Sequence, residues 1–67
     1  MGTSENKVAV KVEASAFKKT EGDQVAKGEL LGYYAGDPVE APFNATVEGV
    51  SFDPKDHALT VVLTKRT

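Results

Sequence analysis

Alternating apolar and polar residues indicate where the strands of this chain lie. Over residues 7–16, every second position is apolar and the gaps hold polar or small residues; the apolar positions are Val8, Val10, Val12, Ala14 and Ala16. The same period of two recurs over residues 59–63. This period is typical of a strand with one buried face. Shorter strands are predicted over residues 17–20, 30–34 and 39–41.

A longer strand is predicted to begin at Ala45 and to pass through Val47, Val50 and Phe52. Its alternation changes phase at Gly49, as a β-bulge would require. No stretch of ten residues free of Gly and Pro repeats apolar residues at helical spacing, so no helix is predicted. The pattern therefore predicts an all-β fold of six or seven short strands, arranged as a small sandwich or barrel.

Turn-forming residues separate these strands. Gly and Asp within residues 21–24 suit positive φ and local side-chain bonds. Residues 35–38 are predicted to form a hairpin tip. Pro42 ends the strand that follows, because proline cannot donate to a ladder. Residues 53–56 place Pro54 at the second position of a type I turn.

The apolar positions that alternate inward form the expected core. Burying each large apolar side chain stabilises the fold by about 1.5–3 kcal/mol. In a chain this short, that only just offsets the entropy of ordering the residues. The predicted core residues are Val8, Val10, Val12, Val25, Leu30, Val39, Val47, Phe52, Leu59, Val61 and Leu63.

Length and charge narrow the class of protein. The chain has 67 residues, no Cys and a formal net charge of −2. So short a chain forms one domain and is too small for a sizeable catalytic cleft, so no enzymatic activity is expected. The absence of Cys excludes disulfides, thiolate zinc sites and thiol catalysis. The weak negative charge argues against nucleic acid and against an anionic membrane surface as partners.

Residues 1–6 are expected to form a flexible tail and residues 7–67 a single domain. The N-terminus lacks the apolar run of a signal peptide. No apolar run is long enough to span a bilayer, so membrane insertion is not expected. The compartment is left unassigned, with the cytoplasm as the default.

Asp53, Asp56 and His57 are the only clustered residues with metal-capable side chains. A metal site needs three or four ligands at a set geometry, and this segment is interpreted as a plain turn. His57 has no Ser, Cys or carboxylate at a suggestive spacing for nucleophilic catalysis. Neither a catalytic residue nor a metal site is predicted.

Two adjacent tyrosines are the candidate contact residues. In a strand, Tyr33 and Tyr34 point to opposite faces, so one is expected in the core and the other exposed. Tyr is favoured at interfaces because it buries a large area at a low entropic cost. The predicted contact hairpin comprises Tyr33, Tyr34, Asp37 and Pro38. The alternative is a plain strand that keeps one solvated phenol.

Two segments carry most of the information. Residues 22–31 read G-D-x-V-x-x-G-x-x-L, in which two Gly-centred turns flank one buried anchor. Residues 41–47 read A-P-F-N-A-T-V, in which a strand stops at Pro and a tight turn starts the next strand. The residues that define these segments are Gly22, Asp23, Val25, Gly28, Ala41 and Pro42.

This ordered pair of segments resembles the biotinyl/lipoyl domain family. The fold of that family is the barrel-sandwich hybrid, a small flattened β-sandwich or half-barrel. The resemblance covers residues 8–64. Ala45 stands where the family prefers Gly, and Asn44 before it tolerates the left-handed backbone region that such a turn uses.

The hairpin between the two segments departs from the carriers of the family. Carriers present a modifiable Lys there, between two Met in biotin carriers and after an Asp in lipoyl carriers. Residues 32–40 contain no Lys. The resemblance therefore implies a non-carrier module without an attached cofactor. Such modules occur in membrane-fusion adaptors, RNA polymerase large subunits and ion-pumping electron-transfer complexes, as contact or spacer elements.

The expected function is a non-catalytic contact or scaffold domain, whose partner is a protein or a neighbouring domain of the same polypeptide. One alternative is a biotin or lipoyl carrier with a displaced Lys. Lys27 is the candidate, although it is interpreted as an ordinary exposed turn Lys. Another alternative is an unrelated small β-barrel that binds nucleic acid or a peptide. Lys65 and Arg66 lack the interleaved aromatics that such a barrel uses.

Overall fold

The computed structural model describes residues 6–15 and 17–66, and these form an all-β fold without a helix. Six strands follow one another along these described residues, and the first ends at Glu13, earlier than the strand predicted over residues 7–16. Their bounds are β1 Lys7–Glu13, β2 Gln24–Val25, β3 Leu30–Tyr34, β4 Asp37–Glu40, β5 Ala45–Asp53 and β6 Ala58–Lys65. The predicted all-β class is confirmed.

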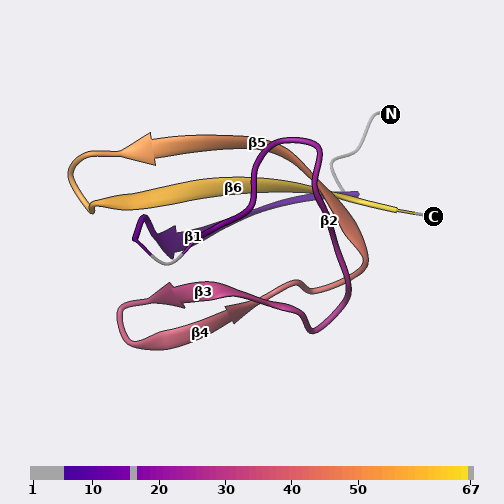
Figure 1. Ribbon diagram of the computed structural model, residues 1–67, viewed down its shortest axis with the longest axis horizontal. Coiled ribbons are helices and arrows are strands. Elements are labelled where there is room, and N and C mark those ends of the chain that lie inside the picture. Colours follow the sequence, from indigo (N-terminus) through magenta and orange to yellow (C-terminus); the bar gives the residue numbers. More distant parts are fainter. Residues whose placement is uncertain (1–5, 16, 67) are drawn as a thin grey trace.

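The strands form two antiparallel sheets. The larger has four strands in the order β1-β6-β5-β2, and the smaller is the β3–β4 hairpin. The larger sheet curls into a half-barrel, and the hairpin lies beside β1 (Figure 1). Short β2 crosses to the start of β5, where Gln24 pairs with Thr46 and Val25 with Ala45.

The register brings the predicted alternating positions together. Val10 pairs with Val61 and Val12 with Leu59, so the apolar positions of β1 and β6 share one face of the sheet. The register of β5 against β6 shifts between Val47 and Gly49. This shift confirms the bulge that the change of phase at Gly49 predicted.

The hydrophobic core lies between the larger sheet and the hairpin, and both contribute residues to it. Five of the predicted core residues are buried, and Val8, Val10, Val39 and Leu59 pack against them while half-buried. Two predictions are wrong, because Leu30 is 48% exposed and Phe52 is 56% exposed. The buried cluster is Val12, Val25, Leu31, Ala41, Ala45, Val47, Val61 and Leu63.

Local strand pairing explains both exposed residues. The register of β3 shifts between Leu30 and Gly32, which leaves Leu31 as the extra residue of a bulge. That bulge turns Leu31 inward, at 4% exposure, and Leu30 outward. Phe52 faces Leu59 near the far end of β5, whereas β2 pairs with β5 only at its start. Phe52 thus lacks a covering element.

The predicted strand over residues 17–20 is wrong, because this segment has no strand pairing. It is an irregular connection held by local polar contacts. The Thr20 amide donates to the Asp23 carboxylate at 3.0 Å. Lys19 forms an ion pair with Glu29 at 2.9 Å.

The two informative segments are hydrogen-bonded to each other. The Gly22 amide donates to the Val47 carbonyl at 2.9 Å, and the Val47 amide donates to the Asp23 carbonyl at 2.8 Å. The Gly28 amide donates to the Ala41 carbonyl at 2.8 Å. Gly22 and Gly28 have φ of 94° and 83°, the positive values that glycine suits.

Asn44 contributes to this contact differently from the prediction. Its backbone does not take the left-handed conformation. Its side-chain oxygen instead accepts the Lys27 amide hydrogen at 2.8 Å, and its carbonyl accepts from the Arg66 amide at 2.8 Å. Asn44 therefore ties the turn before β5 to both the first segment and the C-terminal end of the chain.

Most of the predicted N-terminal tail, residues 1–5, lies outside the described residues. The carbonyl of Asn6 accepts a hydrogen bond from the Lys65 amide at 2.6 Å.

The part of the chain that the structure describes contains no helix of the length and apolar character needed to cross a membrane.

Candidate functional site

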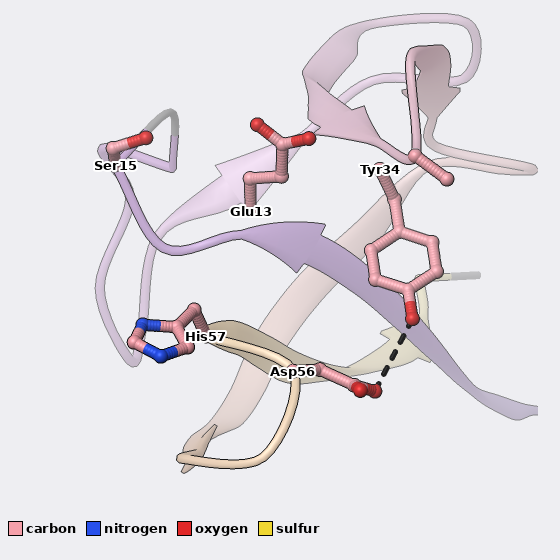
Figure 2. A pocket seen from close by; sticks show the side chains of 6 residues that line it. Glu13, Ser15, Tyr34, Asp56 and His57 are labelled. Atoms are coloured by element: carbon pink, nitrogen blue, oxygen red, sulfur yellow. Dashed lines mark hydrogen bonds between the residues drawn. The ribbon is translucent and has the colours of Figure 1, made fainter.

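An open hollow of about 410 Å³ lies at one end of the molecule, where three segments meet (Figure 2). The end of β1 supplies two of its lining residues, the β3–β4 turn two more, and the β5–β6 turn the last two. We call it the tip hollow. Its lining residues are Glu13, Ser15, Tyr34, Ala35, Asp56 and His57.

The β3–β4 turn is a two-residue loop. Tyr34 pairs with Asp37, and the residues between them, Ala35 and Gly36, have φ of 54° and 86°. Positive φ at both central positions is the type I′ geometry that matches the twist of a hairpin. The predicted tip over residues 35–38 is therefore too long, because Asp37 and Pro38 already belong to β4.

The β5–β6 turn ends in a second left-handed residue. Asp53 pairs with Ala58 across the turn, and the Asp53 side chain accepts the Lys55 amide hydrogen at 3.0 Å. His57 closes the turn with φ of 54°. Its carbonyl accepts the Ala14 amide hydrogen at 3.2 Å, which fixes this turn against the end of β1.

A small polar network joins the walls of the hollow. Lys11 Nζ lies 2.6 Å from Asp56 Oδ2 and 3.5 Å from Asp53 Oδ2. The Tyr34 hydroxyl donates to the same Asp56 oxygen at 3.2 Å (Figure 2). The Lys11 ammonium also lies 5.8 Å from the centre of the Tyr34 ring, within cation–π range. The network connects β1, β3 and the β5–β6 turn.

The network shifts the pKa values of its two central charged groups, Asp56 and Lys11. The hydrogen bond from Lys11, supplemented by that from Tyr34, lowers the pKa of the Asp56 carboxyl. The hydrogen bond to Asp56 raises the pKa of Lys11 despite some desolvation. Both groups therefore stay ionised throughout the neutral range, and the hairpin stays connected to the larger sheet.

The predicted contact hairpin divides into two surfaces. Tyr33 and Pro38 lie directly opposite each other and are exposed. The bulge places Leu30 on this same side. We call Leu30, Tyr33 and Pro38 the outer hairpin face. Tyr34 and Asp37, also directly opposite each other, lie on the other side, where Tyr34 lines the tip hollow.

The tyrosine prediction is half right. Tyr33 and Tyr34 do point to opposite sides of β3, and Tyr33 is 45% exposed. Neither residue joins the buried cluster, because Tyr34 is half-buried and its hydroxyl is engaged by Asp56. Tyr34, the tyrosine on the inner side of β3, therefore makes a polar contact at the tip instead of packing in the core.

The arrangement of side chains does not suit a metal ion. Over residues 6–15 and 17–66, no three His, Asp or Glu side chains are grouped to hold one. Asp53 and Asp56 converge on Lys11 instead. In Figure 2 the Glu13 carboxylate points away from Asp56 and His57.

Several residues of the site escaped sequence reasoning. Glu13, Ser15 and Ala35 gave no signal, because each is an ordinary polar or small residue within or beside a strand. The pairing of Lys11 with Asp56 spans 45 positions of the chain. The one available signal was the position of Lys11 between two inward valines, which predicts an outward side chain but no partner.

Comparisons with protein-family models, with curated proteins and with solved structures found no match for this chain. The resemblance to the biotinyl/lipoyl family therefore stays a prediction that depends on the two segments and their contact.

Proposed function

We propose that the chain is a non-catalytic protein-contact module of the biotinyl/lipoyl-like type, which works without an attached cofactor. Its partner is a separate protein or a neighbouring domain of the same polypeptide. The outer hairpin face makes the contact. The observation that carries this proposal is an exposed Tyr33, flanked by Leu30 and Pro38, on a hairpin without Lys.

Two features support the biotinyl/lipoyl-like fold type. The first is the curled half-barrel with its separate hairpin. The second is the direct hydrogen bonding between residues 22–29 and 41–47, the two segments on which the resemblance rests. Within this contact, Gly22 and Gly28 take the positive φ that glycine suits.

The chemistry of the outer hairpin face suits a protein partner. Tyr combines a large apolar ring with a polar hydroxyl and loses little entropy when it is fixed. Pro38 is already rigid before any contact forms. Glu40 lies opposite Leu30 and adds a charge at the margin, so the face has the apolar centre and polar rim of an interface.

Affinity capture from the native host with matched variants tests the proposed surface. Tyr33→Ser removes the central aromatic of the outer hairpin face, and Phe52→Ser removes another exposed aromatic from the other sheet. We expect a stoichiometric partner to be lost with Tyr33→Ser and kept with Phe52→Ser. Identical capture by both variants and the unaltered chain would contradict the proposal.

Intact mass separates this function from a displaced-lysine carrier. Biotin or lipoate forms an amide with a Lys amine, so co-expression with biotin and lipoate ligases would add the corresponding mass to a carrier. We expect the mass of the unmodified chain. A gain that disappears in Lys27→Arg would establish the carrier alternative and overturn the proposal of a cofactor-free module.

A further inference from the structure

The outer edge of β5 lacks a strand partner over most of its length. β6 pairs with β5 from Ala45 to Asp53. On the other side, β2 pairs only with Ala45 and Thr46, and backbone bonds from Gly22 and Asp23 extend that contact to Val47. In the described part of the chain, residues 49–53 thus present one open edge. Such an edge is a template for another strand.

An exposed aromatic lies on this open edge. Phe52 pairs with Leu59 and Val50 with Val61, so both point to the apolar side of the sheet. Phe52 is 56% exposed, more than Leu30 or Tyr33. A strand added beside β5 would cover this ring with its own side chains while satisfying the open backbone groups.

We propose that a second copy of this chain pairs with the open edge, β5 antiparallel to β5, around a two-fold axis. A two-fold contact uses the same patch on both copies, so the patch must be complementary to itself. An axis at Ser51 places Phe52 opposite Val50 of the second copy. An axis at Phe52 places the two Phe rings opposite each other. Both registers keep apolar residues on one side of the joined sheet.

Intermediate registers are excluded by the alternation of side chains. A shift by one residue would place Phe52 opposite a residue whose side chain points to the polar side of the sheet. The registers centred on Ser51 and on Phe52 place the apolar residues of both copies on the same side of the joined sheet. The result is a continuous sheet in which β5 of each copy occupies the middle.

The charges along the edge also favour a second copy. Lys55 lies exposed in the turn after β5. In the register centred on Phe52 it falls nearest Gly49 of the other copy, whereas in the register centred on Ser51 it falls beside Val47, whose edge Gly22 and Asp23 already occupy. The Glu21 carboxylate lies near Gly49, because a Cβ on Gly49 would be 3.8 Å from it, whereas Glu48 is already bonded to Lys7 and Thr64 of its own copy. In the register centred on Phe52, each Lys55 therefore comes near the Glu21 carboxylate of the other copy, twice per dimer.

Asp53 does not oppose this arrangement. Its carboxylate is 3.5 Å from Lys11 of its own copy, which offsets its charge. Pro54 and the bulge at Glu48 limit the paired segment to about five residues, because proline cannot donate and a bulge interrupts the ladder. These limits and the two-fold symmetry close the contact at two copies and prevent open-ended edge pairing.

Sedimentation velocity over a concentration series from micromolar to millimolar tests the proposal. We expect a reversible monomer–dimer equilibrium for the unaltered chain. Phe52→Lys should weaken dimerisation by about tenfold or more, because each copy loses its edge aromatic and gains a charge. The matched control is Leu30→Lys, which alters another exposed apolar residue, on the other sheet, and should leave the equilibrium unchanged.

The outcomes are distinct. A monomer at every concentration overturns the proposal, even if an unrelated peptide binds the edge. A dimer that Leu30→Lys weakens as much as Phe52→Lys also overturns it. Circular dichroism of both variants checks that the strands persist. Because the β5 edge and the outer hairpin face belong to different sheets, failure here leaves the proposed function standing.

Discussion

At the scale of single residues, two non-glycine residues in left-handed backbone mark the tip of the molecule. Ala35 and His57 both have φ of 54°, and both line the tip hollow. The left-handed region costs about 1–2 kcal/mol for a residue with a Cβ, less for Asn and Asp. The tip therefore holds local strain that the surrounding strand pairing maintains.

Relieving that strain should stabilise the fold. Ala35→Asn introduces the residue that type I′ turns prefer before Gly, and we expect the free energy of unfolding to rise by about 1 kcal/mol. Urea melts followed by circular dichroism measure the change. The control is Ala9→Asn, an exposed position in the middle of β1, where Asn should destabilise. A loss of stability in Ala35→Asn would contradict the assigned turn geometry.

The Lys11–Asp56 pair should make stability depend on pH at both extremes. The folded-state pKa of Asp56 is below its ordinary value of 3.8, so its contribution is complete above that value and is lost as pH falls through the folded-state pKa. The folded-state pKa of Lys11 is above its ordinary 10.5, so its contribution is complete below that value and is lost as pH rises further.

Asp56→Asn should therefore lower stability at neutral pH and make no difference in strong acid, where Asp56 is already protonated. Urea melts at neutral pH and at pH values below the ordinary pKa of Asp test this sign. Asp37→Asn, at an exposed site opposite Tyr34, is the control and should change stability less at neutral pH. Equal losses at both pH values would rule out the ion pair as the cause.

At the scale of elements, the β3–β4 hairpin depends on the rest of the fold. A two-stranded hairpin alone is marginally stable in water. This one is held by Leu31 and Val39 in the core, by the Tyr34–Asp56 bond, and by the Ala41 amide, which donates to Glu29 at 3.0 Å. Its outward side is thereby left free for a contact.

Substitutions of two neighbouring leucines test whether the bulge in β3 turns Leu31 toward the core. Leu31→Ala removes a buried side chain and should lower the free energy of unfolding by about 2–5 kcal/mol. Leu30→Ala alters an exposed residue and should cost about 0.5 kcal/mol or less. Thermal and urea melts of both variants give the comparison. The reverse order of the two effects would mean that the bulge at Leu31 is wrong.

At the scale of the whole molecule, the contact between residues 22–29 and 41–47 joins the two halves of the chain. Val25 is 1% exposed and anchors the first of these segments. Among the described residues, four backbone hydrogen bonds outside the regular strand pairing connect these two segments. The fold therefore depends on contacts between positions that are well separated in sequence.

Val25→Ala should destabilise the whole fold by about 1–3 kcal/mol, because it removes two buried methyl groups and leaves a cavity. For a small domain this is a large share of the total stability. Val62→Ala, at a half-buried site outside the buried cluster, should cost clearly less. Equal urea midpoints for Val25→Ala and the unaltered chain would show that Val25 does not anchor the first segment.

Prediction from the sequence was most successful where the signal was local. The long strands, the bulge at Gly49 and the turns at Gly22 and Gly28 all follow from the chain's own alternation and turn chemistry. The strand over residues 17–20 failed because its polar groups bond locally to Asp23 and Glu29 instead of joining a ladder. At the tip, only Tyr34 among the predicted contact residues lines the hollow.

The sequence by itself determined the all-β class, the positions of the longer strands and the absence of a modifiable Lys between residues 32 and 40, because alternation, turn preference and side-chain identity are properties of neighbouring residues. The tertiary structure alone decided that Leu31 rather than Leu30 is buried, that Phe52 is exposed, and that Lys11 meets Asp56 and Tyr34. Burial and ion pairing depend on which element lies opposite a side chain, and that element is distant along the chain.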